Sequence, residues 1–179
     1  AGHETTASTL AWAFERITRH PDLLAALVEE AENGGKNVGE LRLATILEVQ
    51  RARTVIDLAG RHVFPEMYQL GEWVLARGDS IIVHIGRIHD NPDVFPDPER
   101  FDPQRYIAGK PSAFAWIPFG GGTRRCVGAA FANMEMDVVL RTVLRQFTIE
   151  TTTAPDERRH CRGVAFTPKD GGRVVVHRR

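Results

Sequence analysis

One of the two cysteines, Cys126, lies in a run with unusual chemistry, Phe119-Gly120-Gly121-Gly122-Thr123-Arg124-Arg125-Cys126-Val127-Gly128. The glycine-rich loop delivers the thiol to what reads as the start of a helix. The helix dipole, the N–H groups at that end and the two arginines all favour a thiolate over a thiol. A thiolate is a soft, electron-rich ligand that suits iron, including haem iron. The bare loop also allows something flat to lie against its backbone.

Each residue type in this loop fits such a ligand. Phe119 can shield the sulfur from water, and the loop glycines, Gly120 among them, allow backbone N–H groups to point at it. Gly128 leaves room for a planar ring above the helix. Arg124, two residues before the cysteine, can reach a carboxylate at the edge of such a ring.

Other interpretations of the loop fit less well. A lone thiol beside a turn is usually a buried structural cysteine, but the surrounding pattern disfavours that here. A phosphate-binding loop would need GK[ST] or GxGxxG, and neither is present. A nucleophilic cysteine with one of the seven histidines as its base is conceivable, although no histidine lies in a recognisable cysteine-hydrolase signature.

Composition bounds the class of protein. The 179 residues, 42% of them hydrophobic and 26% charged, are ordinary for one soluble globular domain. Lys+Arg and Asp+Glu both number 23, so the net charge is zero, and no basic tract indicates nucleic acid. No apolar run is long enough to span a bilayer. Two cysteines without a CxxC pair argue against a disulfide framework or a zinc site.

The first half of the chain is predicted to be helical. Residues 1–17 read as the middle of an amphipathic helix with no cap ahead of it, which favours a fragment without its N-terminal part. Pro21 opens a second helix that ends at Asn33-Gly34-Gly35. A third is expected from about Glu40 to Arg53 and is predicted to be buried, because its apolar residues surround more than one face. These are Leu41, Leu43, Ile46, Leu47 and Val49.

The period then changes. Residues 68–83 carry two strand-like runs around turn signals at Gly71 and at 77–79, which predicts a hairpin. Four prolines between Pro92 and Pro103 predict an irregular, bent coil. After the cysteine loop, a helix is expected to continue to about Phe147. Its apolar positions are Val127, Phe131, Met134 and Val138. Strands at 164–166 and 174–176 are expected to be joined at 170–172, so the fold class is mainly α with small β-sheets.

The cysteine loop resembles the haem-binding signature of the cytochromes P-450, the haem-thiolate monooxygenases. Ala1-Gly2-His3-Glu4-Thr5-Thr6 resembles the family's distal helix over the haem, where a small residue and a glycine, here Gly2, leave room for dioxygen. The resemblance implies that Glu4 and Thr5 form an acid–alcohol pair that relays protons. A threonine hydroxyl usually bonds to the carbonyl one turn earlier, and loosening that bond lets it donate elsewhere.

The resemblance extends to a structural network. Glu48 and Arg51 form the only Glu-x-x-Arg in the chain, and spacing of three places them on one helix face. Pro98-Glu99-Arg100-Phe101 follows in the family's order, and the resemblance implies that Arg100 completes a Glu-Arg-Arg triad that fixes the coil leading to the cysteine. Arg61 lies where the family often places a second arginine for the haem propionates.

Some positions depart from the family's pattern. Thr54 stands where proline is usual, three residues after Arg51. The segment 54–58 is expected to face the substrate, yet Asp57 places an acid in this commonly apolar stretch. The loop 156–163 is a second candidate for substrate contact, and Cys161 matches nothing in the pattern.

The resemblance implies a C-terminal part of a P-450 fold, one partial domain over residues 1–179 whose N-terminal half is absent. It implies haem b with Cys126 as axial thiolate, O2, a small lipophilic substrate, and electrons from a ferredoxin, flavodoxin-type donor or reductase, because no nucleotide-binding motif is present. We expect a soluble, cytoplasmic bacterial protein. A peroxygenase or isomerase, a non-catalytic haem-binding sensor or relic, and a haem-free cysteine enzyme remain alternatives; the isolated fragment is expected to be inactive.

Overall fold

The computed structural model of the chain describes residues 2–33, 39–107, 109 and 112–179, so Ala1 of the distal motif and the predicted helix stop at 34–35 lie outside it. Helices precede two small groups of strands that flank one long helix. The elements in chain order are α1 (Glu4–Ile17), α2 (Pro21–Asn33), α3 (Glu40–Ala52), β1 (Leu58–His62), β2 (Met67–Leu70), β3 (Trp73–Ala76), β4 (Ser80–His84), α4 (Ile85–His89), the 3-10 turns η1 (Pro103–Tyr106) and η2 (Gly122–Arg124), α5 (Ala129–Gln146), β5 (Phe147–Ile149), β6 (Arg159–Arg162), β7 (Ala165–Pro168) and β8 (Val176–Arg178).

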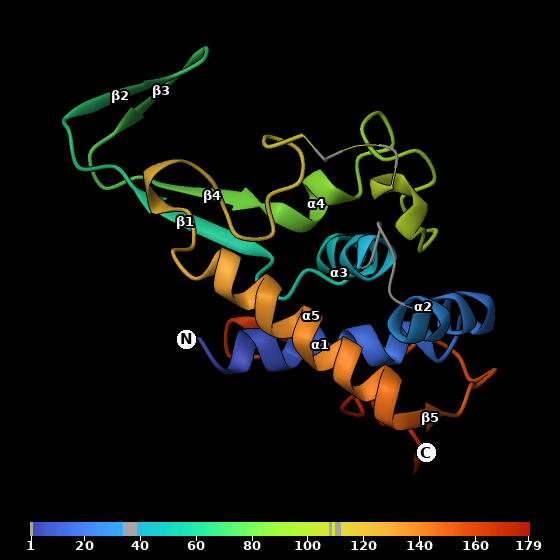
Figure 1. Ribbon diagram of the computed structural model, residues 1–179. Helices are drawn as coiled ribbons and strands as arrows, with labels where there is room; N and C mark the ends of the chain where they lie inside the picture. Colours follow the sequence, from blue (N-terminus) through green and yellow to red (C-terminus); the bar gives the residue numbers. More distant parts are fainter. Residues whose placement is uncertain (1, 34–38, 108, 110–111) are drawn as a thin grey trace.

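The helices form the body of the molecule (Figure 1). Helix α5 crosses α1, α2 and α3, and one hydrophobic core joins residues from all four, with β5 and β7 closing its edge. The largest fully buried apolar side chains of this core are Trp12, Ile17, Leu27, Ile46, Met136, Leu140 and Leu144. Complete burial of each side chain stabilises the folded state by about 1.5–3 kcal/mol. The packing of α1, α2, α3 and α5 against one another is therefore a major source of folding stability.

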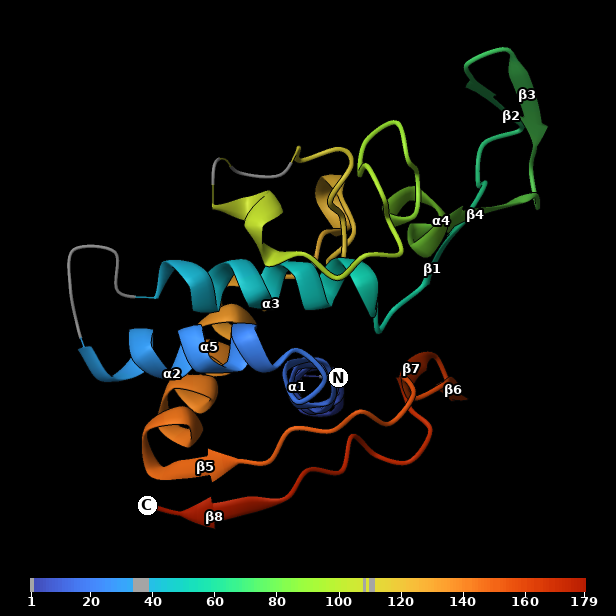
Figure 2. The same ribbon diagram turned by 90° about the vertical axis from the view of Figure 1, so that its right-hand side faces the viewer.

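Helix α3 separates two layers. Figure 2 shows α1, α2 and the terminal strands on one side of it, and the irregular coil and the cysteine loop on the other. The expected burial of α3 is confirmed for Ile46 and Val49, but Leu43 is 45% exposed. The charged side chains of Arg42, Glu48 and Arg51 on the same helix are buried. Ion pairs as well as apolar packing therefore hold α3 in position.

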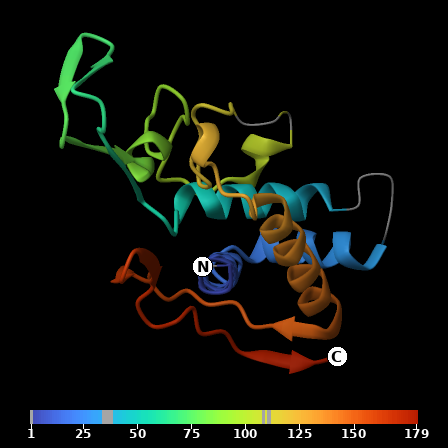
Figure 3. The same cartoon turned by 90° about the vertical axis from the view of Figure 1, so that its left-hand side faces the viewer.

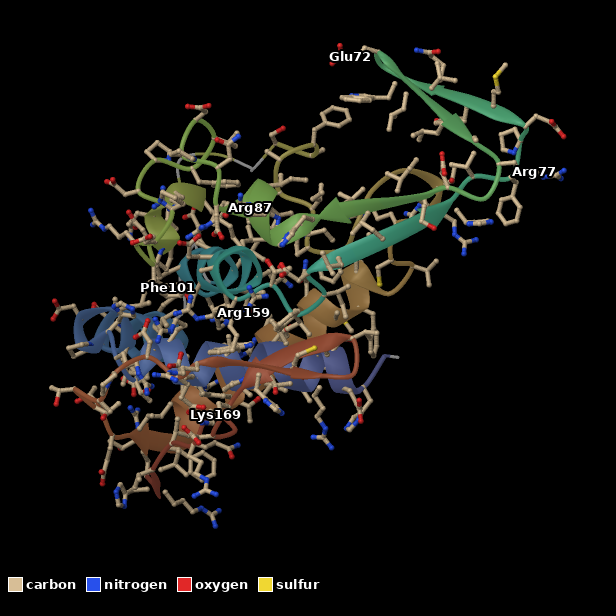
Figure 4. All side chains as sticks on the ribbon, turned by 180° about the vertical axis from the view of Figure 1, so that it is seen from behind. Glu72, Arg77, Arg87, Phe101, Arg159 and Lys169 are labelled. Carbon is tan, nitrogen blue, oxygen red and sulfur yellow. The ribbon has the colours of Figure 1, made fainter. Side chains whose placement is uncertain are left out.

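The predicted hairpin at 68–83 is only half right. β2 and β3 pair around Gly71, with Leu70 opposite Trp73, but β4 leaves this hairpin and pairs with β1 instead. The sequence showed strand-like runs without showing their partners. The β2–β3 hairpin projects from the body in all three ribbon views (Figure 3), and Figure 4 places Glu72 at its far end.

The C-terminal strands also pair differently from the expected hairpin. β7 pairs with β6 around Gly163, and β8 pairs with β5 at the end of α5. The glycines at 171 and 172 do form a turn with positive φ values of 85° and 65°. A Cβ on Gly172 would lie 2.5 Å from the Ala11 carbonyl oxygen, so this turn packs directly against α1 rather than joining two paired strands.

The apolar positions expected for the helix after the cysteine loop lie on its exposed side. Its stripe of Val127, Phe131, Met134 and Val138 is exposed, with exposed fractions from 56% to 105%. The face that packs on the core is the opposite one, formed by Ala129, Met136, Leu140 and Leu144. The helix has two apolar faces, and periodicity alone cannot say which one meets the body.

Candidate active site

The cysteine loop delivers Cys126 to the beginning of α5, as expected. Gly120 and Gly122 have φ values of 70° and 65°, a region that favours glycine. The loop closes through the Cys126 N–H, which donates to the Phe119 carbonyl oxygen at 2.9 Å. Cys126 is exposed and forms no disulfide with another described residue, and α5 starts three residues later.

The surface around the thiol suits a flat, apolar group. Val127 and Phe131 beside it are exposed, and Phe119 is half-buried with its ring 6.2 Å from that of Trp116 in an edge contact. A Cβ on Gly128 would meet only the Cys126 sulfur, at 3.9 Å, and one on Gly120 would meet nothing within 4 Å. An exposed soft donor beside an exposed apolar helix face fits a haem group whose iron is held by a thiolate.

Two arginines are available to carboxylates. Arg124 in η2 and Arg61 in β1 are both exposed. Among the described residues neither forms an ion pair with an acid, and Arg61 donates only to the neighbouring Gly60 carbonyl oxygen at 2.8 Å. Since guanidinium groups bind carboxylates strongly, both arginines fit the role of propionate anchors.

The distal motif occupies the first turn of α1. Glu4 is exposed and Thr5 is half-buried. Their carbonyl oxygens accept hydrogen bonds from the Ser8 hydroxyl at 2.7 Å and the Thr9 hydroxyl at 2.9 Å. A Cβ on Gly2 would meet nothing within 4 Å among the described residues.

Glu48 and Arg51 form the predicted buried pair. Arg51 donates to both carboxylate oxygens of Glu48 at 2.8 Å, and both side chains are fully buried. Arg51 also donates to the carbonyl oxygens of His89 at 3.1 Å and Pro98 at 2.8 Å. Burial alone would lower the pKa of Arg51, but hydrogen bonds to Glu48 and its charge raise that pKa, which keeps the guanidinium charged.

The expectation for Arg100 is wrong. Its side chain is 71% exposed and lies 3.8 Å from Asp102, and only its backbone oxygen faces Arg51. The arginine beside Glu48 is Arg105, with 3.6 Å between Nε and the carboxylate. The Pro-x-Arg-aromatic pattern of 98–101 recurs at 103–106, and the η1 turn points the second copy inward. That repeat was the signal that could have identified Arg105.

Sequence reasoning also missed His89. The imidazole is completely buried, with Nδ1 2.8 Å from the Thr54 hydroxyl and Nε2 3.0 Å from the Ile117 N–H. Burial, and then the charge of Arg51, lower its pKa to about 4, so the ring is neutral at physiological pH. The unusual threonine at position 54 was the available signal.

The proposed substrate segment 54–58 faces mostly inward. Thr54, Val55 and Asp57 are buried, whereas Leu58 is 51% exposed. The Asp57 carboxylate lies 3.5 Å from Arg159, so the acid is turned toward a cation. In the second candidate segment, Asp156 accepts from Arg16 at 2.7 Å and from Arg53 at 2.9 Å.

The described residues include no helix with both the length and the apolar character needed to cross a membrane. They also include no group of three or more His, Cys, Asp or Glu side chains that could hold a metal ion.

Comparisons with known proteins agree with this geometry. The cytochrome P450 family model matches residues 1–173. The chain is 77% identical to cytochrome P450 138 of Mycobacterium tuberculosis over all 179 residues, which are 40% of that protein, and 43% identical to cytochrome P450 135B1 of the same species over 98% of this chain and 38% of that protein. The chain thus spans about 40% of the length of these relatives.

Solved structures show the same fold. The retinoic acid-bound cyanobacterial CYP120A1 superimposes with a TM-score of 0.84 at 27% identity, over 98% of this chain and 43% of that one. The haem domain of cytochrome P450DA gives 0.82 at 23% identity, over 99% of this chain and 42% of that one, which supports the fold alone. With the loop, the Glu48–Arg51 pair and the family model in agreement, this chain belongs to the cytochrome P450 family.

Proposed function

We propose that the protein carrying this chain is a haem-dependent monooxygenase, with Cys126 as the thiolate ligand of haem b. The observation that carries the proposal is the exposed thiol, presented by a glycine loop at the start of α5 beside an exposed apolar helix face. Bound haem would supply the iron centre at which O2 is reduced and one oxygen atom passes to the substrate.

The chain's own residues would hold this group from several sides. Cys126 would bind the haem iron as a thiolate and donate electron density to it. Phe119 would exclude water from the sulfur, and the absence of side chains at Gly120 and Gly128 would allow the ring to approach the backbone. Arg124 and Arg61 would bind the propionates, since neither is paired with an acid in the described part of the chain.

The distal residues would handle protons. Glu4 is exposed and can exchange protons with solvent, and the half-buried Thr5 follows it in the first turn of α1. We assign proton delivery to this pair. Electrons would come from a ferredoxin, a flavodoxin-type protein or a reductase. A lipophilic substrate agrees with Leu58, an exposed apolar residue of the segment 54–58 that is expected to face the substrate.

The thiolate assignment is tested with Cys126→Ala and Cys126→Ser in a full-length, haem-loaded protein that carries these residues. The parent should show the thiolate-type Soret band after reduction and addition of carbon monoxide, and both variants should lose it. Cys161→Ser is the matched control and should retain the band, because this cysteine lies in strand β6, far along the chain from the loop. A variant without Cys126 that kept the band would refute the proposal.

Dependence of turnover on an electron donor tests the reaction type. Product formation that requires reduced donor and O2 supports a monooxygenase. Product formation with peroxide alone, and none with reduced donor and O2, would contradict this reaction type.

A further inference from the structure

A buried chain of hydrogen bonds joins α3, α4 and the segment that enters the cysteine loop. The Thr54 side chain follows the end of α3 and is 2% exposed, and His89 at the end of α4 is completely buried. The two side chains meet at 2.8 Å, and the His89 ring reaches the Ile117 N–H at 3.0 Å. Three segments that are distant in sequence are therefore connected by one imidazole.

The partners fix the protonation of this ring. Nε2 faces the Ile117 N–H, so Nε2 must accept and carries no proton. The single proton is therefore on Nδ1 and is donated to the Thr54 oxygen. The Thr54 hydroxyl donates its single hydrogen, shared between the carbonyl oxygens of Gln50 at 3.0 Å and Arg51 at 2.9 Å. Every polar atom in this buried chain is satisfied, and each hydrogen bond has only one possible direction.

This chain of hydrogen bonds ends at Ile117, the residue from which the cysteine loop turns. The Ile117 carbonyl oxygen accepts from the Gly120 N–H at 2.9 Å, which forms the first turn of the loop, and the Phe119 carbonyl oxygen accepts from the Cys126 N–H at 2.9 Å. The preceding residue, Trp116, donates through its indole nitrogen to the Leu47 carbonyl oxygen of α3 at 3.1 Å. The entrance to the loop is thus held by α3 through Trp116 and by α4 through His89.

We propose that His89 is a positioning residue for Cys126, which acts by fixing the Ile117 peptide from which the cysteine loop turns, with Thr54 orienting the imidazole. The proposal rests on the proposed function only in its consequence, the geometry of the thiolate ligand. Its local claim, that His89 holds the Ile117 peptide, stands on hydrogen bonds between described residues.

The direct test is the exchange rate of the Ile117 amide hydrogen, followed by nuclear magnetic resonance with ¹⁵N-isoleucine. A full-length protein that carries these residues is used, as its reduced carbon monoxide complex. His89→Phe keeps a ring but removes both nitrogens, and it should speed exchange of this amide about tenfold, as expected for loss of one hydrogen bond. His89→Gln places an oxygen acceptor near the position of Nε2 and should restore most of the protection.

Two further variants separate positioning from general packing. Thr54→Val keeps the side-chain shape without the hydroxyl, and it should speed Ile117 exchange by a smaller factor, whereas Thr54→Ser should not. His84→Phe is the matched control, because His84 also accepts a backbone N–H, from Arg87 at 3.3 Å, but lies on the surface. It should leave the Ile117 amide unchanged. If His89→Phe does not fold, the Thr54 pair still decides the question.

The state of the Cys126 sulfur as iron ligand is measured on the same samples by absorption spectroscopy. In His89→Phe, a part of the reduced carbon monoxide complex should shift from the thiolate-type to the thiol-type Soret band at a temperature where the protein is folded, and His89→Gln should reverse the shift. Unchanged Ile117 exchange in folded His89→Phe and Thr54→Val would overturn the proposal, as would faster exchange with an unaltered Soret band. If the parent protein itself shows no thiolate band, the proposed function fails, while the exchange rates still decide whether His89 holds the loop.

Discussion

Glu48 and Arg51 face each other on α3 through two parallel hydrogen bonds of 2.8 Å, and neither side chain is exposed to solvent. The remaining donors of Arg51 reach carbonyl oxygens in the segments at 89 and 98, and Glu48 accepts from the Asp102 N–H at 2.9 Å. One ion pair therefore organises the irregular coil between α4 and the cysteine loop. Since both charges are buried, the pair is sensitive to loss of either partner.

Replacing Glu48 by Gln should destabilise the protein by about 3–5 kcal/mol, because the buried Arg51 charge would lose its counter-charge. Urea denaturation measures this loss. The control is Glu66→Gln, whose carboxylate is 92% exposed and lies 3.7 Å from Arg77. That change should cost no more than about 0.5 kcal/mol. Equal stabilities of the two variants would show that the buried pair does not organise the coil.

The two arginines of the repeated Pro-x-Arg pattern should behave differently. Arg105→Ala should cost about 1–3 kcal/mol, because the Arg105 guanidinium lies against Glu48 and also donates to the Asp97 carbonyl oxygen at 2.8 Å. Arg100→Ala should stay within about 0.5 kcal/mol, because that side chain is mostly in solvent. Thermal and urea unfolding compare the two, and a larger effect at Arg100 would restore the original assignment.

The buried His89 predicts a loss of stability in acid. Its pKa is lowered to about 4 in the folded state by burial and by Arg51, against about 6.5 in the unfolded chain. Unfolding therefore takes up a proton below pH 6.5, and stability falls as the pH drops from 6.5 to about 4, by on the order of 3 kcal/mol. Above pH 6.5 this contribution is constant.

His89→Gln should remove this part of the pH dependence. The measurement is the free energy of unfolding of both proteins at several pH values between 4.5 and 7. The slope should be shallower in the variant, while other acid-sensitive groups continue to contribute. Asp156 contributes little to the slope in this range, because its hydrogen bond to Arg16 lowers its pKa from an ordinary value of 3.8, which already lies below pH 4.5. Parallel slopes in the two proteins would contradict the assignment.

Substitutions on the two faces of α5 should change the stability of the protein by different amounts. In the 179-residue chain, Phe131→Gln should leave stability within about 0.5 kcal/mol and reduce light scattering, since this side chain is 62% exposed. Met136→Ala, at 2% exposure, should cost about 2–5 kcal/mol through the cavity it leaves. The reverse order of destabilisation would place the other face of the helix in the core.

Thr5→Ala tests the proposed proton relay. In a full-length protein with haem and an electron donor, this variant should consume electrons with less product and release more peroxide, because the hydroxyl that passes a proton is missing. Peroxide and product are measured against electron-donor consumption. Thr9→Ala, one turn further along α1, removes a buried hydroxyl that bonds to the Thr5 carbonyl oxygen and should leave coupling largely intact. Unchanged coupling in Thr5→Ala would exclude the relay.

The sequence alone determined the local features. The spacing of Glu48 and Arg51, the position of Cys126 before a helix, and the bounds of α2 and α3 all follow from interactions within a few residues of the chain. Capping signals, helical periodicity and glycines with positive φ act locally, so they can be recognised without knowledge of the fold.

Only the tertiary structure decided which partners meet. It brought Arg105 rather than Arg100 to Glu48, paired β4 with β1 and β8 with β5, and turned Phe131 outward and Met136 inward on α5. It also placed His89 between Thr54 and Ile117. The physical reason is that these contacts join segments tens of residues apart, and their energies depend on packing and desolvation that no local pattern encodes.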